Sequence, residues 1–108
     1  MAPVEVDPVL VDPTRLSIVS LLAGVKWAEF AWVRDTVGLS PSALSKQIST
    51  LDSHGYLTVE RGYVGKRPRT WVGLSAEGHA ALENHVTALQ NIVEQSRQTA
   101  SSHQLGDT

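Results

Sequence analysis

The sequence predicts a small α+β domain that is mainly α, and three observations predict it. Two short apolar helical patterns are separated by about four residues that include a glycine. After Gly55 the apolar period changes from 3.6 residues to 2, which indicates strands over residues 56–60 and 70–74. A long amphipathic pattern then covers residues 75–98. The length of 108 residues fits one domain with a buried core.

Composition excludes several classes of protein. Hydrophobic residues make up 42% and charged residues 19% of the chain, which is a globular balance. Cysteine is absent, so disulfides, thiol nucleophiles and thiolate metal sites are excluded. The longest apolar stretch, residues 18–25, is too short to cross a membrane, and residues 1–12 lack the basic start of a secretory signal. We therefore expect a cytoplasmic protein without a membrane partner.

The first helix begins after Asp12-Pro13, a capping residue followed by a proline that suits the first helical turn. Residues 1–6 are expected to form a loose lead-in to a domain over residues 7–98. Apolar residues at helical spacing continue to Gly24 and form a face wider than one small core needs. We therefore expect part of this face to meet another chain. Residues 27–30 indicate a brief extended piece.

A tight link joins the next two helices. Residues 30–37 predict a short helix that Gly38 ends. Ser40 is a good N-cap, and Pro41 fits the first turn of a third helix over about 41–54. Two helices separated by about four residues that include a glycine are the signature of a helix-turn-helix.

The third helix has an apolar and a polar side. Leu44, Ile48 and Leu51 fall within about 60° of one another on a helical wheel. The opposite side carries short hydroxyls and one cation, which can come close to bases and phosphates in a DNA major groove. The candidate DNA-binding residues here are Ser40, Ser42, Ser45, Lys46, Gln47 and Ser49. Among them, Gln47 lies at the edge of the buried side. The alternative is an ordinary amphipathic helix whose polar side only confers solubility.

Positive charge is concentrated in the middle of the chain. The formal net charge is −2, but residues 40–71 carry five bases against two acids, and both flanks are acidic. Residues 61–69 contain two glycines and a proline, and they predict a long basic tip between the two strands of a β-hairpin. Such cations can follow phosphates or enter a narrow minor groove. The candidates are Arg61, Lys66, Arg67 and Arg69. The alternative is a basic surface loop without a partner.

The last helix is predicted over about 75–98, with Ser75 as its cap and a disordered tail over 99–108. An apolar seam runs along it at spacings of four, three and four residues. The seam consists of Leu82, Val86, Leu89 and Val93. One small recognition surface binds too weakly to select sites in a genome, whereas a two-fold pair doubles the contacts and spaces the half-sites ~34 Å apart. We therefore expect a homodimer that uses this seam. The alternative is that the helix only covers its own core.

The order of these elements resembles the winged helix-turn-helix regulators of the MarR/ArsR kind, and the compact MarR-like group most closely. The resemblance spans about residues 7–95, and the basic hairpin string is its most specific part. The strings that carry it are Asp12-Pro-Thr-Arg-Leu16, Gly38-Leu-Ser-Pro-Ser-Ala-Leu-Ser-Lys-Gln-Ile48, Leu51-Asp-Ser-His-Gly-Tyr-Leu57, Val64-Gly-Lys-Arg-Pro-Arg-Thr70 and Leu74-Ser-Ala-Glu-Gly78.

The resemblance implies a dimeric transcriptional regulator, with repression as the expected action. Its recognition helices would lie in successive major grooves of a pseudo-palindromic operator, and its hairpins, the wings, would lie on the backbone or minor groove. Two positions depart from the pattern. Gly73 stands where similar proteins often carry a long basic residue, and Trp71 faces outward where a smaller residue is usual.

Other functions have less support from the sequence. No two of the four histidines have the i, i+4 spacing that binds a metal readily, so we expect no metal or other cofactor. The sequence contains no glycine-rich phosphate loop and no nucleophile elbow, so we expect that the protein is not an enzyme. Trp27 and Trp32 lie near the expected dimer interface, where regulators of this type hold small effectors. We interpret them as core and interface filler and leave an effector open. The competing function is a protein-interaction module of the same fold.

Overall fold

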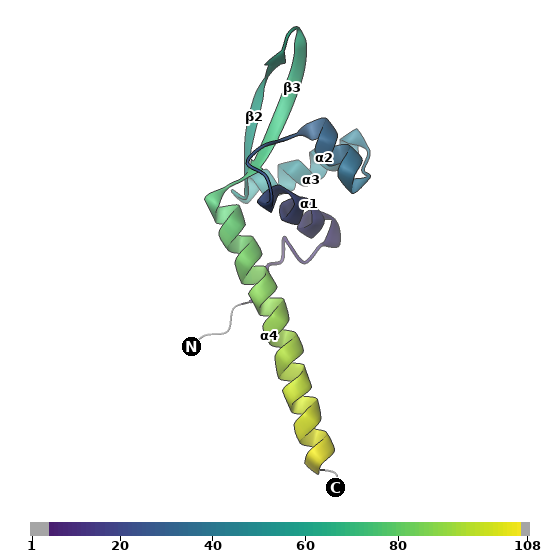
Figure 1. Ribbon diagram of the computed structural model, residues 1–108, viewed down its shortest axis with the longest axis vertical. Coiled ribbons are helices and arrows are strands. Elements are labelled where there is room, and N and C mark those ends of the chain that lie inside the picture. Colours follow the sequence, from purple (N-terminus) through teal and green to yellow (C-terminus); the bar gives the residue numbers. More distant parts are fainter. Residues whose placement is uncertain (1–4, 107–108) are drawn as a thin grey trace.

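The computed structural model describes residues 5–106, which form four helices and one three-stranded antiparallel sheet (Figure 1). The elements, in chain order, are α1 (Pro13–Ala23), β1 (Ala28–Glu29), α2 (Phe30–Val37), α3 (Pro41–Ser53), β2 (Leu57–Val64), β3 (Arg67–Leu74) and α4 (Ala76–Gly106). The predicted α+β fold with a helical majority is confirmed. Of the predicted lead-in, residues 1–4 lie outside the described part of the chain, and residues 5 and 6 have no regular secondary structure.

The predicted caps explain where the helices begin and end. A carboxylate oxygen of Asp12 accepts a hydrogen bond from the Arg15 amide at 3.0 Å at the start of α1. Ser40 Oγ accepts from the Ala43 amide at 3.2 Å at the start of α3. Gly38 ends α2 in the left-handed conformation with φ +73°, which glycine adopts without strain.

The core lies between the first three helices and one face of the sheet. The sheet has the order β1-β3-β2, and Val59 pairs with Val72 on the face that the helices cover. Side chains at alternate strand positions point to opposite faces, so Glu60 and its partner Trp71 lie on the outer face. The largest completely buried apolar side chains are Leu10, Ile18, Val19, Leu22, Val33, Leu44, Leu51 and Val72.

The β-hairpin has longer strands than the sequence predicts. Residues 61–69 were expected to form a loop, but β2 continues to Val64 and β3 begins at Arg67. Only Gly65 and Lys66 remain between them, because a glycine with φ +62° can occupy the first position of a tight hairpin turn. β3 accommodates Pro68 because it is paired on one side only at that position. The basic segment is therefore a stiff two-stranded arm.

Helix α4 is also longer than predicted. The sequence places its end near residue 98, with a disordered tail after it, whereas the helix continues to Gly106. No glycine or proline occurs between residues 79 and 105, so nothing in that stretch interrupts the helix. Its polar residues do not end it either, since Ser96 Oγ donates to the Ile92 carbonyl at 2.8 Å within the helix. Residues 107 and 108 lie outside the described residues.

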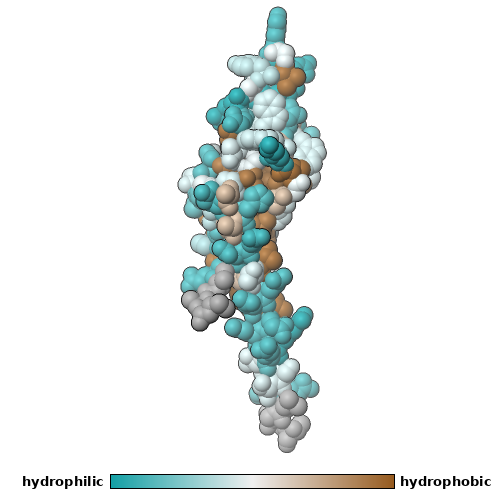
Figure 2. All heavy atoms as spheres, turned by 60° about the vertical axis from the view of Figure 1, so that its left-hand side comes forward, coloured by the Kyte–Doolittle hydropathy of each residue, from teal (hydrophilic) through white to brown (hydrophobic). Residues whose placement is uncertain are grey.

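Only the first third of α4 packs on the rest of the molecule. Ala81 and Leu82 contact the core, and His85 and Ala88 are buried. Every side chain from residue 89 to residue 104 is exposed, and α4 extends away from the body in a molecule 73 Å long (Figure 1). Figure 2 shows hydrophobic atoms at the middle of the molecule and on the adjoining part of α4, whereas the hairpin end is mainly hydrophilic.

Gly78 allows α4 to approach the base of the hairpin. A Cβ at this position would collide with the Tyr56 carbonyl oxygen and lie 2.6 Å from Leu74 Cδ1. We expect Gly78→Ala to lower the free energy of unfolding by about 1–3 kcal/mol, since the backbone must shift to relieve the overlap. Urea unfolding measures this. Gly24→Ala is the matched control: its Cβ would meet only the Leu21 carbonyl at an ordinary 3.6 Å, so stability should not fall. Equal effects of both substitutions would contradict the packing role of Gly78.

Candidate nucleic-acid interface

The outward side of α3 is polar and unobstructed. Ser42, Ser45, Lys46 and Ser49 are exposed, while Leu44, Ile48 and Leu51 on the other side are buried. The distribution follows from the helical period, which puts residues three and four apart on one side. The structure thus presents short hydroxyls and one ammonium group on a single helix face, a surface that can come close to base edges.

Two of the predicted α3 residues are engaged within the molecule. Ser40 Oγ caps the helix and lies 3.4 Å from Ser42 Oγ. Gln47 Oε1 accepts a hydrogen bond from Arg15 Nη1 at 3.2 Å, and Arg15 Nε donates to the Val9 carbonyl at 2.6 Å. Gln47 therefore connects α3 to α1 and to the N-terminal segment, and it lies apart from the outward hydroxyls.

A shallow groove separates α3 from the hairpin. It has a volume of about 260 Å³, and Ser45 and Ser49 on one wall face Arg61 and Thr70 on the other. Arg61 pairs with Thr70 on the face of the sheet that points toward the helices. The structure therefore brings one predicted hairpin cation beside the polar side of α3.

The tip of the hairpin carries the next two cations. Lys66 lies in the turn and Arg67 is the first residue of β3, and both are exposed. Within residues 5–106, no ion pair involves Lys46, Arg61 or either of these two cations. Four of the predicted DNA-binding cations are thus available to an anionic partner.

Arg69 has a different environment. Its Nε lies 2.9 Å from Glu29 Oε1, and its side chain is half-buried on the outer face of the sheet. The sequence groups Arg69 with the other hairpin cations, but the strand register turns it to the opposite face from Arg61 and gives it a carboxylate partner. Sequence analysis missed Glu29 because the pairing of β1 with β3, which brings the two residues together, is not visible in the local pattern.

The hairpin tip also exposes two residues that the sequence analysis did not select. Tyr63 is 74% exposed, and Val64 beside it is also exposed. The sequence does contain a signal for these two residues, because they are an aromatic and an apolar residue within a basic segment. Apolar side chains at the tip of a basic arm can contact sugars in a minor groove.

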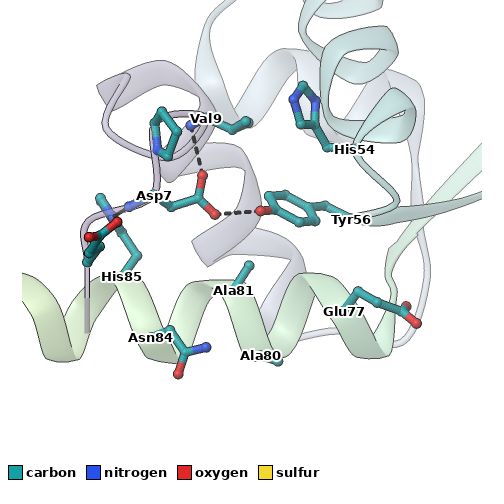
Figure 3. A pocket seen from close by; sticks show the side chains of 11 residues that line it. Asp7, Val9, His54, Tyr56, Glu77, Ala80, Ala81, Asn84 and His85 are labelled. Atoms are coloured by element: carbon teal, nitrogen blue, oxygen red, sulfur yellow. Dashed lines mark hydrogen bonds between the residues drawn. The ribbon is translucent and has the colours of Figure 1, made fainter. Parts of the chain in front are cut away.

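A hydrogen-bonded cluster joins the N-terminal segment, the base of the hairpin and α4 (Figure 3). Tyr56 Oη donates to Asp7 Oδ2 at 2.5 Å, and the Asp7 amide donates to His85 Nδ1 at 2.9 Å. These residues line a groove of about 600 Å³ between α4 and the N-terminal segment. The cluster fixes the position of α4 on the body.

The hydrogen bonds of this cluster, together with burial, shift two pKa values. Burial acts to raise the pKa of Asp7, but the hydrogen bonds from Tyr56 and from the amides of Val9 and Leu10 outweigh it, so the pKa lies below 3.8. The hydrogen bond to the Asp7 carboxylate, assisted by burial, raises the pKa of Tyr56 to about 12.

Tyr56→Phe is expected to lower the free energy of unfolding by about 1–2 kcal/mol at pH 7, because a partly exposed hydrogen bond to a carboxylate is lost. The lowered pKa of Asp7 means that its ionised form stabilises the fold above pH 3.8 and that this stabilisation is lost as the pH falls through the folded value. The raised pKa of Tyr56 means that its contribution is complete below pH 10 and is lost as the pH rises through about 12.

The difference between wild type and variant should therefore be smaller in acid, as urea midpoints at pH 7 and about pH 3 would show. Tyr63→Phe is the control, since this tyrosine is exposed at the hairpin tip and should change stability by less than about 0.5 kcal/mol. A difference for Tyr56→Phe that is as large in acid as at neutral pH would contradict the proposed charge dependence.

No helix in residues 5–106 combines the length and apolar character that a membrane crossing needs. In the same residues, no three His, Cys, Asp or Glu side chains are grouped so that they could hold a metal ion.

Comparison with known proteins adds independent information. A family model described as "Winged helix DNA-binding domain" matches residues 14–93. An uncharacterized protein of Methanocaldococcus jannaschii is 22% identical over 72 residues, which are 67% of this chain and 78% of that protein.

Solved structures show the same fold. A transcriptional regulator homologue from Pyrococcus horikoshii superposes with a TM-score of 0.74 at 24% identity, over 81% of this chain and 86% of that chain. ZitR, a zinc-responsive MarR family member from Lactococcus lactis, superposes with a TM-score of 0.57 at 17% identity, over 83% of this chain and 61% of that chain. A ZitR mutant solved in complex with DNA superposes with a TM-score of 0.56. The expected MarR-like winged-helix fold is confirmed.

Proposed function

Because the chain belongs to the winged helix DNA-binding domain family, we propose that it is a sequence-specific transcriptional regulator of double-stranded DNA that acts as a homodimer. Repression by occupation of a promoter is the proposed action. The relatives described above come from archaea and a bacterium, whose DNA lies in the cytoplasm, so the cytoplasm is the proposed site of action.

One observation carries the proposal: the polar side of α3 and Arg61 border the same shallow groove, and two more unpaired cations lie farther along the same hairpin. Ser45 and Ser49 face Arg61 across the groove, and Lys66 and Arg67 continue the positive charge to the tip. A helix with short side chains suits a major groove, and a stiff basic arm suits the adjoining backbone or minor groove. This arrangement supports simultaneous contact by both elements.

Each predicted residue has a proposed role. Ser42, Ser45 and Ser49 approach bases and phosphates, and Lys46 is the proposed reader of a guanine. Ser40 and Gln47 hold α3 in place through the contacts described above. Arg61, Lys66 and Arg67 are proposed phosphate contacts of the wing. Arg69 is proposed to position β3 against β1 through Glu29 and not to contact DNA directly.

The proposed dimer forms along α4. Leu82 is half-buried, but Val86, Leu89 and Val93 are exposed on a helix segment that extends from the body. Residues 89–104 of α4 are exposed, and most helical stability in proteins comes from tertiary packing, so packing against a second copy would stabilise this segment. Along the seam, leucine and valine alternate at spacings of four and three residues. This pattern favours parallel two-stranded packing.

Parallel packing also suits binding to one DNA duplex. The hairpin and the free end of α4 lie at opposite ends of the long axis (Figure 1). Two copies joined by parallel α4 helices would therefore present both hairpins and both α3 helices at the same end. An antiparallel pair would send them to opposite ends. The parallel arrangement fits a pseudo-palindromic operator with half-sites ~34 Å apart.

Titration of a random-sequence duplex at two salt concentrations tests the function. A dimer that places six wing cations on phosphates should lose about a thousandfold in affinity between about 50 and about 200 mM salt. Lys26→Ala, which removes an exposed cation outside the interface, should leave this dependence unchanged. Negligible affinity at both salt concentrations would reject DNA binding and favour the protein-interaction module. Selection of bound sites from a random pool then identifies the operator.

A further inference from the structure

The outer face of the sheet carries two tryptophans beside a glutamate. Trp27 is 39% exposed and comes directly before β1, and Trp71 lies in β3 opposite Glu60 of β2. These three residues line an open cleft of about 360 Å³. The cleft lies on the face opposite to the one that α3 and Arg61 share, so the proposed DNA contacts do not use it.

Two glycines make room for the indole rings. A Cβ on Gly62 would lie 3.2 Å from Trp71 Cζ3, and a Cβ on Gly73 would lie 3.4 Å from Trp27 Cε3. At Gly73 a Cβ would also lie 2.7 Å from the Lys26 carbonyl oxygen, so any other residue would displace the segment that carries Trp27. Both rings thus lie close to the backbone of the sheet. This packing explains why position 73 holds a glycine.

The cleft has an uncompensated negative charge. Glu29 and Glu60 flank Trp71 on the two neighbouring strands. Arg69 neutralises Glu29 at 2.9 Å, whereas Glu60 is exposed and takes part in no ion pair within residues 5–106. A carboxylate beside two indole rings that line an open cleft attracts a cation, because the ring faces are electron-rich and tryptophan gives the strongest cation–π interaction.

We propose that this cleft is a binding site for a small organic cation that carries a quaternary ammonium or similar weakly hydrated charged group. The two indoles would contact the charged group, and the Glu60 carboxylate would neutralise it. A volume of about 360 Å³ lined by three residues fits a small molecule, whereas a protein partner would need a much wider contact surface. The proposal does not depend on DNA binding. The competing explanation is that the tryptophans only cover the outer face of the sheet.

Titration with benzyltrimethylammonium chloride, followed by NMR of the three indole Nε1–H signals, tests the site. The Trp27 and Trp71 signals should shift and saturate with a dissociation constant on the order of 1 mM, as expected for a ligand this small. The Trp32 signal is the internal control, since this tryptophan is 45% exposed on α2, outside the cleft. Benzyl alcohol, with the same ring and no charge, should bind at least about fivefold more weakly.

Glu60→Gln should weaken binding of the cation about fivefold and leave the fold intact, because the side chain is exposed. Glu83→Gln removes an exposed carboxylate on α4 and should have no effect. Equal binding of benzyl alcohol, equal shifts of all three indole signals, or unchanged affinity in Glu60→Gln would each overturn the proposal. A titration without saturable shifts at concentrations about tenfold above the expected constant would overturn it too.

Discussion

Leu89→Asp is expected to separate the dimer and to weaken binding to a duplex with two half-sites by about a hundredfold or more. The carboxylate would lie in the proposed seam, where a second copy would have to bury it without a partner. Loss of the second recognition unit removes the gain that linked binding sites provide. Leu89 is 38% exposed in the single chain, so the substitution leaves the monomer core intact. Light scattering measures the mass in solution, and fluorescence anisotropy measures the affinity for DNA.

Asn91→Asp is the matched control for this experiment. It adds the same charge to an exposed position of α4 that the seam does not include, so it reports any general repulsion of DNA. The mass in solution and the affinity for DNA should both remain those of the wild type. A wild-type chain that is monomeric at working concentrations, or a Leu89→Asp variant that stays dimeric with full affinity, would contradict the proposed interface.

The second large effect concerns the hairpin. Arg61→Ala combined with Arg67→Ala should weaken binding to all DNA sequences alike, by on the order of tenfold or more at low salt. Each substitution should also lower the slope of log affinity against log salt by about one unit per half-site, because fewer counterions are released. Anisotropy titrations at four or five salt concentrations give this slope.

Arg69→Ala is the informative comparison, since it removes the same charge from the same hairpin. The Arg69 guanidinium is paired with Glu29. Loss of this side chain should therefore leave the slope of log affinity against log salt unchanged and affect mainly the position of β3. A fall in slope equal to that of Arg67→Ala would show that the pair with Glu29 opens and that Arg69 reaches the phosphates. No change in slope for Arg61→Ala and Arg67→Ala would reject the wing contacts.

The sequence predicts elements well where the deciding interactions are local. Asp12, Ser40 and Gly38 specify helix ends through contacts within three or four residues, and the structure confirms each of them. The change of apolar period after Gly55 likewise reflects the two faces of a strand. The helix pair, the hairpin and the long last helix could all be predicted for this reason.

The errors arise where glycine, proline or polar residues suggest a break that the fold does not contain. Gly62 and Pro68 indicate a loop, but the first packs under Trp71 and the second lies where β3 is paired on one side only. The residues after Gln98 are polar, but they include no helix breaker before Gly106. In both segments the composition is typical of a loop and the backbone continues regularly.

Within the candidate site, exposure was predictable and pairing was not. The helical period places Ser45 and Lys46 outward without any knowledge of the fold. The partners of Gln47 and Arg69 come from α1 and β1, 32 and 40 positions earlier in the chain. Such contacts depend on strand register and helix packing, which one sequence does not reveal.

The contact between the start of α4 and the rest of the domain has a consequence for the choice of operator. In the proposed dimer, the two α4 helices pack together and each carries one winged-helix body. The angle between α4 and its body therefore sets the distance between the two α3 helices. Gly78 and the contacts of Asp7 with Tyr56 and His85 hold α4 at that angle, although none of these residues belongs to the proposed set of DNA contacts. A small change in this angle would shift the two α3 helices by a larger distance. Substitutions here should therefore change the preferred spacing between half-sites before they change the preferred bases.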